Sequence, residues 1–243
     1  MHSRWLKLVA IVTMTVDHIG YMLFPFATGF RIIGRIAFPI FAFLIAYGCT
    51  KTRNLSLYFL RLFGFGVWLQ AAWLLFMPTY NMNIFFTLSL GVACIWLIEK
   101  MRFVLDRPFL CVLGAIPLIC LIMGTAELAR TDYGTSGVFL IILFWAGLKL
   151  LEYMRAKNFR VMATPASSVA IRALIVMTAL VLFNLMYSLL YNYYGIQWYS
   201  LFAVLFLALF WDKKLKIPTW EKWAFYLYFP VHMVVLYLIQ TFL

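Results

Sequence analysis

The stretch "WLKLVAIVTMTVDHIGYMLFP", residues 5–25, decides the class of fold to which this sequence belongs. At 1.5 Å per helical residue it is long enough to cross the hydrocarbon core of a bilayer, about 30 Å thick. It is almost entirely apolar, yet Asp17 and His18 stand side by side within it. Ionisable side chains inside a membrane span are costly and are candidates for a functional site.

The composition of the whole chain extends this interpretation beyond the first span. Of 243 residues, 66% are hydrophobic and 12% are charged, and the mean hydropathy is +0.96. Soluble domains carry about 25% charged residues. The chain has no room for a sizeable soluble domain, so we expect one transmembrane domain over residues 1–243. Its four cysteines show no spacing typical of a disulfide framework or a zinc site, and we expect no metal.

Apolar runs of membrane-spanning length recur along the sequence and are separated by short charged or turn-forming segments. They predict an all-α polytopic membrane protein with about nine transmembrane helices in one bundle. The predicted spans are residues 5–25, 30–48, 55–77, 82–98, 108–126, 135–151, 170–191, 196–211 and 222–242.

The basic residues predict the orientation of these spans. With nine spans, fifteen lysines and arginines fall on one side: Arg4, Lys7, Lys51, Arg53, Lys100, Arg102, Arg107, Lys149, Arg155, Lys157, Arg160, Lys213, Lys214, Lys216 and Lys222. Arg31 and Arg130 fall on the other side, and Arg35, Arg61 and Arg172 lie within spans. By the positive-inside rule the N-terminus is cytoplasmic and the C-terminus is outside. Because the charge is spread over several loops, it does not indicate a nucleic-acid partner.

The ionisable residues within the spans are few. Asp17 is the one acid deep in an apolar run, and His18 and His232 lie in the middle of the first and last spans. The two histidines could reach similar depth and belong to one site, or each could be a hydrogen-bonded core residue. Neighbours on a helix point about 100° apart, so Asp17 needs a partner from another helix. Arg35 and His232 are the two candidates.

The second span, "FRIIGRIAFPIFAFLIAYG" (residues 30–48), carries two arginines four residues apart, Arg31 and Arg35, which share a helix face. They either snorkel toward the interface or form a cationic wall that pairs with Asp17 or binds an anionic group. Pro39 cannot donate a helix hydrogen bond and is expected to kink this span.

Three further stretches are alternatives between local structure and a site. "NMNIFFTLSLG" (81–91) and "RTDYGTSG" (130–137) place Asn83 and Tyr133 on the predicted outer side. "TKTRN" (50–54) is a basic cytoplasmic turn, and Arg61 follows two helical turns later. On sequence alone these residues fit caps, turns or topology as well as a binding role.

Several of these segments resemble the TraX family of membrane proteins, which is associated with conjugative pilus systems. The resemblance rests on "LKLVAIVTMTVDHIG", "RIIGRIAFPIFAFLIAYG", "TRN", "YFLRL", "NIFFTLSLG", "DYGTSGV" and "FPVHM", in that order. The sequence is also similar, more loosely, to the membrane acyltransferases that O-acetylate sugars. Those enzymes carry a histidine in the first helix and another near the end of the last. They have an arginine where this chain has Lys7.

The resemblance implies N-acetylation of a pilin subunit, or more broadly acetyl transfer from acetyl-CoA to an amine or hydroxyl of a peptide, pilin or small molecule. On that basis His18, Asp17 and His232 are the catalytic candidates, and Arg31, Arg35, Asn83 and Tyr133 are the substrate-binding candidates. Lys51, Arg53 and Arg61 are the candidates for binding CoA. The implied location is the bacterial cytoplasmic (inner) membrane, with the lipid bilayer as surroundings.

Two alternatives from other functional classes stay open. A buried aspartate with two buried histidines is also typical of a proton relay, as in a proton-coupled small-molecule transporter or flippase. Transporters often show internal repeats, and none is visible in this sequence. A pilus-assembly subunit without catalysis is the other alternative, and it would tolerate neutral substitutions at Asp17, His18 and Arg35.

Overall fold

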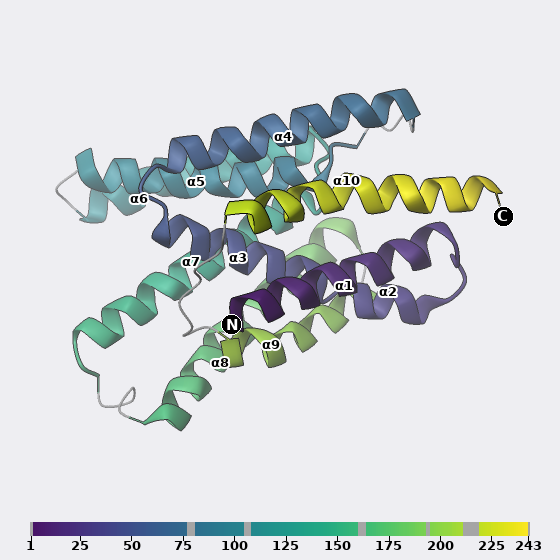
Figure 1. The fold of residues 1–243 in the computed structure, drawn as a ribbon. Helices are drawn as coiled ribbons and strands as arrows, with labels where there is room; N and C mark the ends of the chain where they lie inside the picture. The colour runs from purple at the N-terminus through teal and green to yellow at the C-terminus, as the bar shows by residue number, and fades with distance from the viewer. Residues whose placement is uncertain are drawn as a thin grey trace. The chain divides into compact units, whose positions relative to one another are not determined.

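A computed structural model describes residues 2–76, 81–104, 108–159, 164–192, 195–210 and 219–242, and these residues are helical apart from short turns (Figure 1). The described part contains no β-strand and one isolated bridge, between Met82 and Thr131. The prediction of an all-helical protein is therefore confirmed. Five of the predicted cytoplasmic basic residues lie outside the described residues, namely Arg107, Arg160, Lys213, Lys214 and Lys216.

The chain divides into two compact units, each with its own packed helices. The first comprises Met1–Phe41 and Lys157–Leu243, and the second comprises Ala42–Ala156. The first unit contains α1 (His2–Met22), α2 (Thr28–Gly34), α8 (Pro165–Tyr191), the 3₁₀ helix η2 (Ile196–Phe202), α9 (Ala203–Phe210) and α10 (Thr219–Phe242). The second contains α4 (Leu55–Phe76), α5 (Ile84–Val104), α6 (Pro108–Leu128) and α7 (Gly134–Ala156), and α3 (Ala37–Lys51) begins in the first unit and ends in the second.

Six segments of the described chain are long and apolar enough to cross a membrane: Thr28–Lys51, Leu55–Leu74, Ile84–Val104, Phe109–Leu128, Gly134–Ala156 and Pro165–Tyr191. Two shorter apolar segments, Ile196–Leu209 and Tyr226–Phe242, correspond to the last two predicted spans. These helices are those of a multi-pass membrane protein. The count of nine spans and the sidedness of the termini stay predictions.

Two of the predicted spans differ locally from a single α-helix. The second is interrupted at residues 35 and 36, between α2 and α3. Pro39 lies in the first turn of α3, just after this interruption, and it has no N–H with which to continue the helical hydrogen bonds of α2. The eighth begins with the 3₁₀ helix η2 and continues as α9. Gln197 and Ser200, three residues apart in η2, are both buried.

Helix α1 packs against α2 and α10 within the first unit. The approach to α2 is close at two glycines: Gly20 faces the side chain of Phe30, and Gly34 faces the side chain of Asp17. Against α10, Thr15 contacts Tyr228 and His18 contacts His232, so both helices run in the same direction (Figure 1).

Candidate functional site

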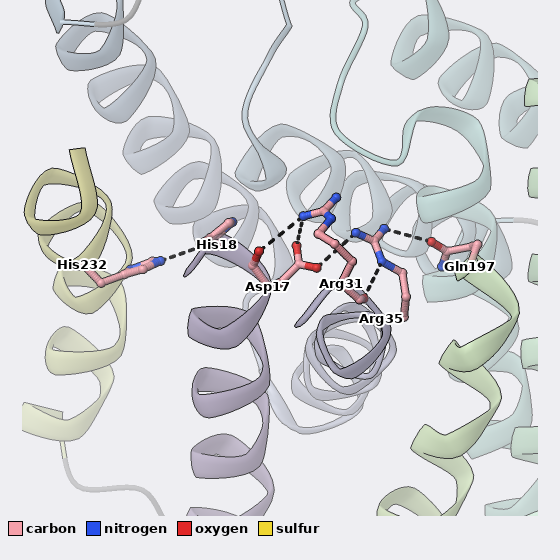
Figure 2. Close-up of polar contacts among 6 residues, drawn as sticks. All are labelled: Asp17, His18, Arg31, Arg35, Gln197 and His232. Carbon is pink, nitrogen blue, oxygen red and sulfur yellow. Dashed lines mark hydrogen bonds and ion pairs between the residues drawn. The ribbon is translucent and has the colours of Figure 1, made fainter. Parts of the chain in front are cut away.

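A row of polar side chains lies across the apolar first unit (Figure 2). It runs from His232 on α10 through His18 and Asp17 on α1 to Arg31 on α2 and to Arg35, just after α2. It ends at Gln197 on η2. The site therefore draws on the beginning and the end of the chain, which are more than 200 residues apart.

Asp17 is shared between two arginines. Its Oδ2 accepts a hydrogen bond from Arg31 Nη1 at 2.7 Å, and its Oδ1 accepts one from Arg35 Nη2 at 3.1 Å. The side chain of Asp17 is 16% exposed, against 27% for Arg31 and 11% for Arg35. Of the two partners predicted for Asp17, the structure therefore has Arg35, and it adds Arg31. Charge-assisted bonds of this kind are about twice as strong as neutral ones, so they hold α1 and α2 together.

The local sequence explains why the carboxylate fits between the arginines. Arg31 and Arg35 are four residues apart, and Arg35 Nε also donates to the carbonyl of Arg31 at 3.3 Å. Gly34 lies on the α2 surface that faces α1. A Cβ atom there would collide with Oδ1, Cβ and Cγ of Asp17. The absent side chain at Gly34 thus makes room for the carboxylate of Asp17.

Gln197 completes the arginine cluster, and it was not among the residues predicted from the sequence. Arg35 Nη1 donates to Gln197 Oε1 at 3.1 Å, and Gln197 is 1% exposed. Because a guanidinium can only donate, the oxygen of the amide must face Arg35. The amide nitrogen Nε2 is buried and has no acceptor in the described part of the protein. The signal that could have identified Gln197 is a neutral amide in an otherwise apolar span.

His18 and His232 form a hydrogen-bonded pair. Nδ1 of His18 lies 2.8 Å from Nε2 of His232, and the two rings stack with centroids 5.0 Å apart. The other ring nitrogen of His232, Nδ1, lies 2.8 Å from the carbonyl oxygen of Tyr228. His232 is 7% exposed, and both its ring nitrogens have partners.

The carbonyl of Tyr228 determines which atoms carry protons in this pair. A carbonyl oxygen only accepts, so Nδ1 of His232 carries a proton. In neutral His232 the Nε2 atom is then an acceptor, and His18 must donate to it through its own Nδ1. Nε2 of His18 is left unprotonated, and no described residue forms a hydrogen bond with it. This arrangement makes His18 Nε2 a base.

Aromatic side chains enclose the two imidazoles. The ring of Tyr228 stacks on His232 at 5.0 Å, and Phe229 packs edge-on against both histidines, at 6.0 Å from His18 and 5.6 Å from His232. The hydroxyl of Tyr228 lies 2.7 Å from Thr15 Oγ1, which itself donates to the carbonyl of Ile11. Tyr228 therefore donates to Thr15, and this bond fixes the rotation of α10 against α1.

The aspartate and the histidine that are adjacent in sequence belong to two separate networks. Within the described residues, Asp17 bonds to Arg31 and Arg35, and His18 bonds to His232. The structure has no hydrogen bond between Asp17 and either histidine. Asp17 therefore positions the arginines beside His18, and the carbonyl of Tyr228 is the group that orients the imidazole pair.

The other two substrate-binding candidates lie in the second unit. Asn83 is 4% exposed, and its side chain bonds to the carbonyl of Gly66, to Gln70 Oε1 and to the backbone N–H of Phe85 at the start of α5. All its donors are used in this capping arrangement. Tyr133 is half-buried and has a positive φ of 61° in the turn before α7. A role of either residue in binding substrate stays a prediction.

The three CoA-binding candidates also lie in the second unit, in and around the turn between α3 and α4. Lys51 Nζ lies 3.4 Å from Glu152 Oε1 and 5.5 Å from the centre of the Tyr47 ring, and its side chain is 55% exposed. Arg53 and Arg61 are exposed. These side chains are accessible to an anionic ligand. Among the described residues no group of three or more His, Cys, Asp or Glu comes together as a metal site would require.

Comparisons with known proteins agree with the resemblance found in the sequence. The family model described as "TraX protein" matches residues 3–240. An uncharacterized protein of Rickettsia prowazekii (strain Madrid E) is 32% identical over 142 residues, which are 57% of this chain. The match covers 52% of that relative, so the chain spans about half its length. No solved structure matches the chain.

Proposed function

Because this chain belongs to the TraX family, we propose that it is an integral-membrane acetyltransferase that moves an acetyl group from acetyl-CoA to an acceptor amine or hydroxyl. The observation that carries the proposal is the hydrogen-bonded pair of His18 and His232, which leaves Nε2 of His18 free as a base. Acetyl transfer needs such a base, because the attacking amine or hydroxyl must lose a proton.

In the proposed reaction His18 Nε2 accepts the proton of the acceptor. The acceptor nitrogen or oxygen forms a bond to the thioester carbonyl carbon, and the carbon–sulfur bond breaks. Protonated His18 then returns its proton to the CoA thiolate. While His18 is charged, its Nδ1–H bond to His232 becomes charge-assisted, which stabilises the imidazolium. His232 uses both ring nitrogens in this arrangement, which supports a role in positioning and proton relay over one as a transient acyl carrier.

Asp17 contributes by holding Arg31 and Arg35 next to His18. Its two carboxylate oxygens are both occupied by guanidinium donors, so it is a positioning residue in this mechanism. The positive charge of the arginines favours the oxyanion that develops on the acetyl carbonyl. The Lys51, Arg53 and Arg61 side chains are proposed to bind the anionic CoA moiety on the cytoplasmic side of a bacterial inner membrane.

The TraX description fits a pilus-related role. The proposed acceptor is a pilin N-terminus, and the alternative acceptors are another peptide or a small molecule. In this topology the N-terminus is cytoplasmic and the C-terminus is outside. The acceptor then reaches the site from the outer side, because Asp17 lies ten residues beyond Lys7 on α1, or about 15 Å.

A proton-coupled transporter is the second candidate, since paired histidines next to an ionised cluster also occur in proton pathways. Continuous transfer would require a link between the histidine pair and the arginine cluster. The described side chains provide no hydrogen bond from His18 to Asp17, which favours the enzyme. A pilus-assembly subunit without catalysis would need neither network to be intact.

The test is acetyl-CoA turnover by the purified full chain in detergent, with release of CoA and transfer of labelled acetyl measured together. We expect the wild type to release CoA and His18→Ala to be inactive. Imidazole added to His18→Ala should restore part of the activity, because it can enter the half-buried space left by the side chain and replace the lost base. A folded wild-type protein that binds no acetyl-CoA but carries proton flux in liposomes would show that the transporter alternative is right.

A further inference from the structure

Of the three nitrogens of the Arg31 guanidinium, one forms hydrogen bonds within the described residues. Its Nη1 donates to Asp17, through Oδ2 at 2.7 Å and through the backbone carbonyl at 3.5 Å. Within the described residues, Nε and Nη2 donate to nothing. These two atoms form the side-on edge of the guanidinium, the edge that receives a carboxylate or phosphate in bidentate fashion. The Nε and Nη2 atoms of Arg31 therefore form a fork of two donors that a ligand can occupy.

This fork is fixed in place. Asp17 holds one side of the Arg31 guanidinium, and the ring of Tyr21 lies 5.3 Å beneath its central carbon. The side chain is 27% exposed, so a ligand can reach it. A guanidinium that is already ordered loses less entropy when a ligand binds, which increases affinity for a planar anionic group.

The charges of the cluster favour the same kind of ligand. Asp17 is one carboxylate shared between the guanidiniums of Arg31 and Arg35, so it neutralises one of two positive charges. Positive charge within a membrane protein is costly unless an anion compensates it. A second donor of the cluster, Nε2 of Gln197, is buried and also lacks an acceptor in the described structure. Arg31 and Gln197 thus still have donors without an acceptor among the described residues, and an oxyanion supplies acceptor atoms.

We propose that the open edge of Arg31 binds a carboxylate or phosphate group of the acceptor, so that the acceptors of this protein are anionic amines or alcohols. This inference rests on the proposed acetyl transfer, and it names the substrate class. Arg31 bonds to Asp17, and His18 is the neighbour of Asp17 in sequence. In Figure 2 the side chains of Arg31 and His18 lie on opposite sides of Asp17. An anion on Arg31 would hold the acceptor beside the base. The donor is an unsuitable source of that anion, because the phosphates of CoA are expected at the cytoplasmic end of the protein.

The first experiment measures anion binding without any acetyl donor. Thermal unfolding of the full chain in detergent is followed while propionate or inorganic phosphate is added, with sodium chloride at equal ionic strength as reference. A ligand that binds the folded state raises the unfolding temperature. We expect an increase of about 2–4 °C at saturating propionate or phosphate.

Three variants assign the effect to Arg31. Arg31→Lys keeps the charge and the pairing with Asp17 but has no planar fork, so its affinity for the anion should fall at least about tenfold. Arg31→Gln should lose the effect. Arg130→Gln is the matched control, since Arg130 is the other arginine predicted on the outer side and is exposed; it should behave as the wild type. Equal affinity in wild type and Arg31→Lys would overturn the assignment.

Two further measurements distinguish the source of the anion. Adenosine 3′,5′-bisphosphate, the phosphate-bearing end of CoA, should compete weakly with propionate, and phosphatidylglycerol in nanodiscs should not displace it. Strong competition by either would assign the site to the donor or to a lipid and overturn the acceptor assignment. Absence of anion binding to the wild type would overturn the anion site itself. The proposed acetyl transfer would not be contradicted by that result.

The last measurement ties the anion to the reaction. Acetyl transfer to glycylglycine is compared with transfer to glycylglycine amide, which lacks the carboxylate. The wild type should show a KM at least about tenfold lower for the free acid at similar kcat, and Arg31→Lys should lose most of that difference. Equal KM values in the wild type would contradict the proposal even if the anion binds.

Discussion

The contact between Gly34 and Asp17 gives the sharpest structural test of the arginine cluster. In Gly34→Ala the new Cβ would fall on Oδ1, Cβ and Cγ of Asp17, closer than side-chain carbons approach in proteins. Either α1 and α2 separate by about an ångström, or the carboxylate rotates away from its arginines. Overpacking of this kind costs about 1–3 kcal/mol. For a chain of this size, that corresponds to an unfolding temperature lower by roughly 2–12 °C.

The matched control is Gly29→Ala in the same helix. Nothing lies within 4 Å of a Cβ atom built at Gly29, so this variant should unfold at or slightly above the wild-type temperature. The two variants are compared by thermal unfolding in detergent and by acetyl transfer. A displacement of about 1 Å at a reacting site can reduce the rate by about 10². If Gly34→Ala matches Gly29→Ala in both assays, Asp17 does not depend on the close approach of α2.

The remaining predictions concern single polar side chains. Asp17→Asn removes the carboxylate charge that Arg31 and Arg35 share, so the unfolding free energy should fall by roughly 3 kcal/mol. His232→Ala removes the acceptor that sets the tautomer of the first-helix histidine, so turnover should fall by about tenfold without reaching the level of the uncatalysed reaction. Asn83→Ala removes the α5 cap, so the unfolding temperature should fall while the KM for the acceptor stays unchanged. A raised KM in Asn83→Ala would instead support the predicted substrate-binding role.

The sequence predicted the charged part of the site well because charge is rare in membrane spans. Asp17 stood out as an acid within an apolar run, and Arg31 and Arg35 stood out by their spacing of one helical turn. The electrostatic cost of leaving these charges unpaired indicates that they find one another, whatever the details of packing. The structure has both ion pairs.

Contacts between neutral groups were harder to predict, because they depend on the rotation of each helix about its axis. The sequence placed His18 and His232 at similar depth but left open whether His232 contacts Asp17. The bond between Tyr228 and Thr15, together with the packing of α10, turns His232 toward His18 instead. Gln197 carries no charge, so its place in an apolar span is a weaker signal than that of Asp17.

The same distinction applies to the fold. Hydropathy alone indicated where the helices lie, because burial in a bilayer needs long apolar segments. The break at residues 35 and 36 precedes Pro39, a helix-breaking residue that the sequence shows, whereas no proline or glycine within η2 marks its 3₁₀ geometry. Asn83 was an open alternative between cap and site, and its contacts are those of a cap.

The central claim is that Nε2 of His18 is the base for acetyl transfer. The most direct measurement is single-turnover acetyl transfer by the full chain with His18→Ala beside the wild type and Arg130→Gln, each shown to be folded by its unfolding temperature. A positioned base contributes about 10²–10⁴ to the rate, so His18→Ala should be slower by that factor while Arg130→Gln keeps the wild-type rate. Transfer by His18→Ala at the wild-type rate would contradict the assignment of His18 as the base.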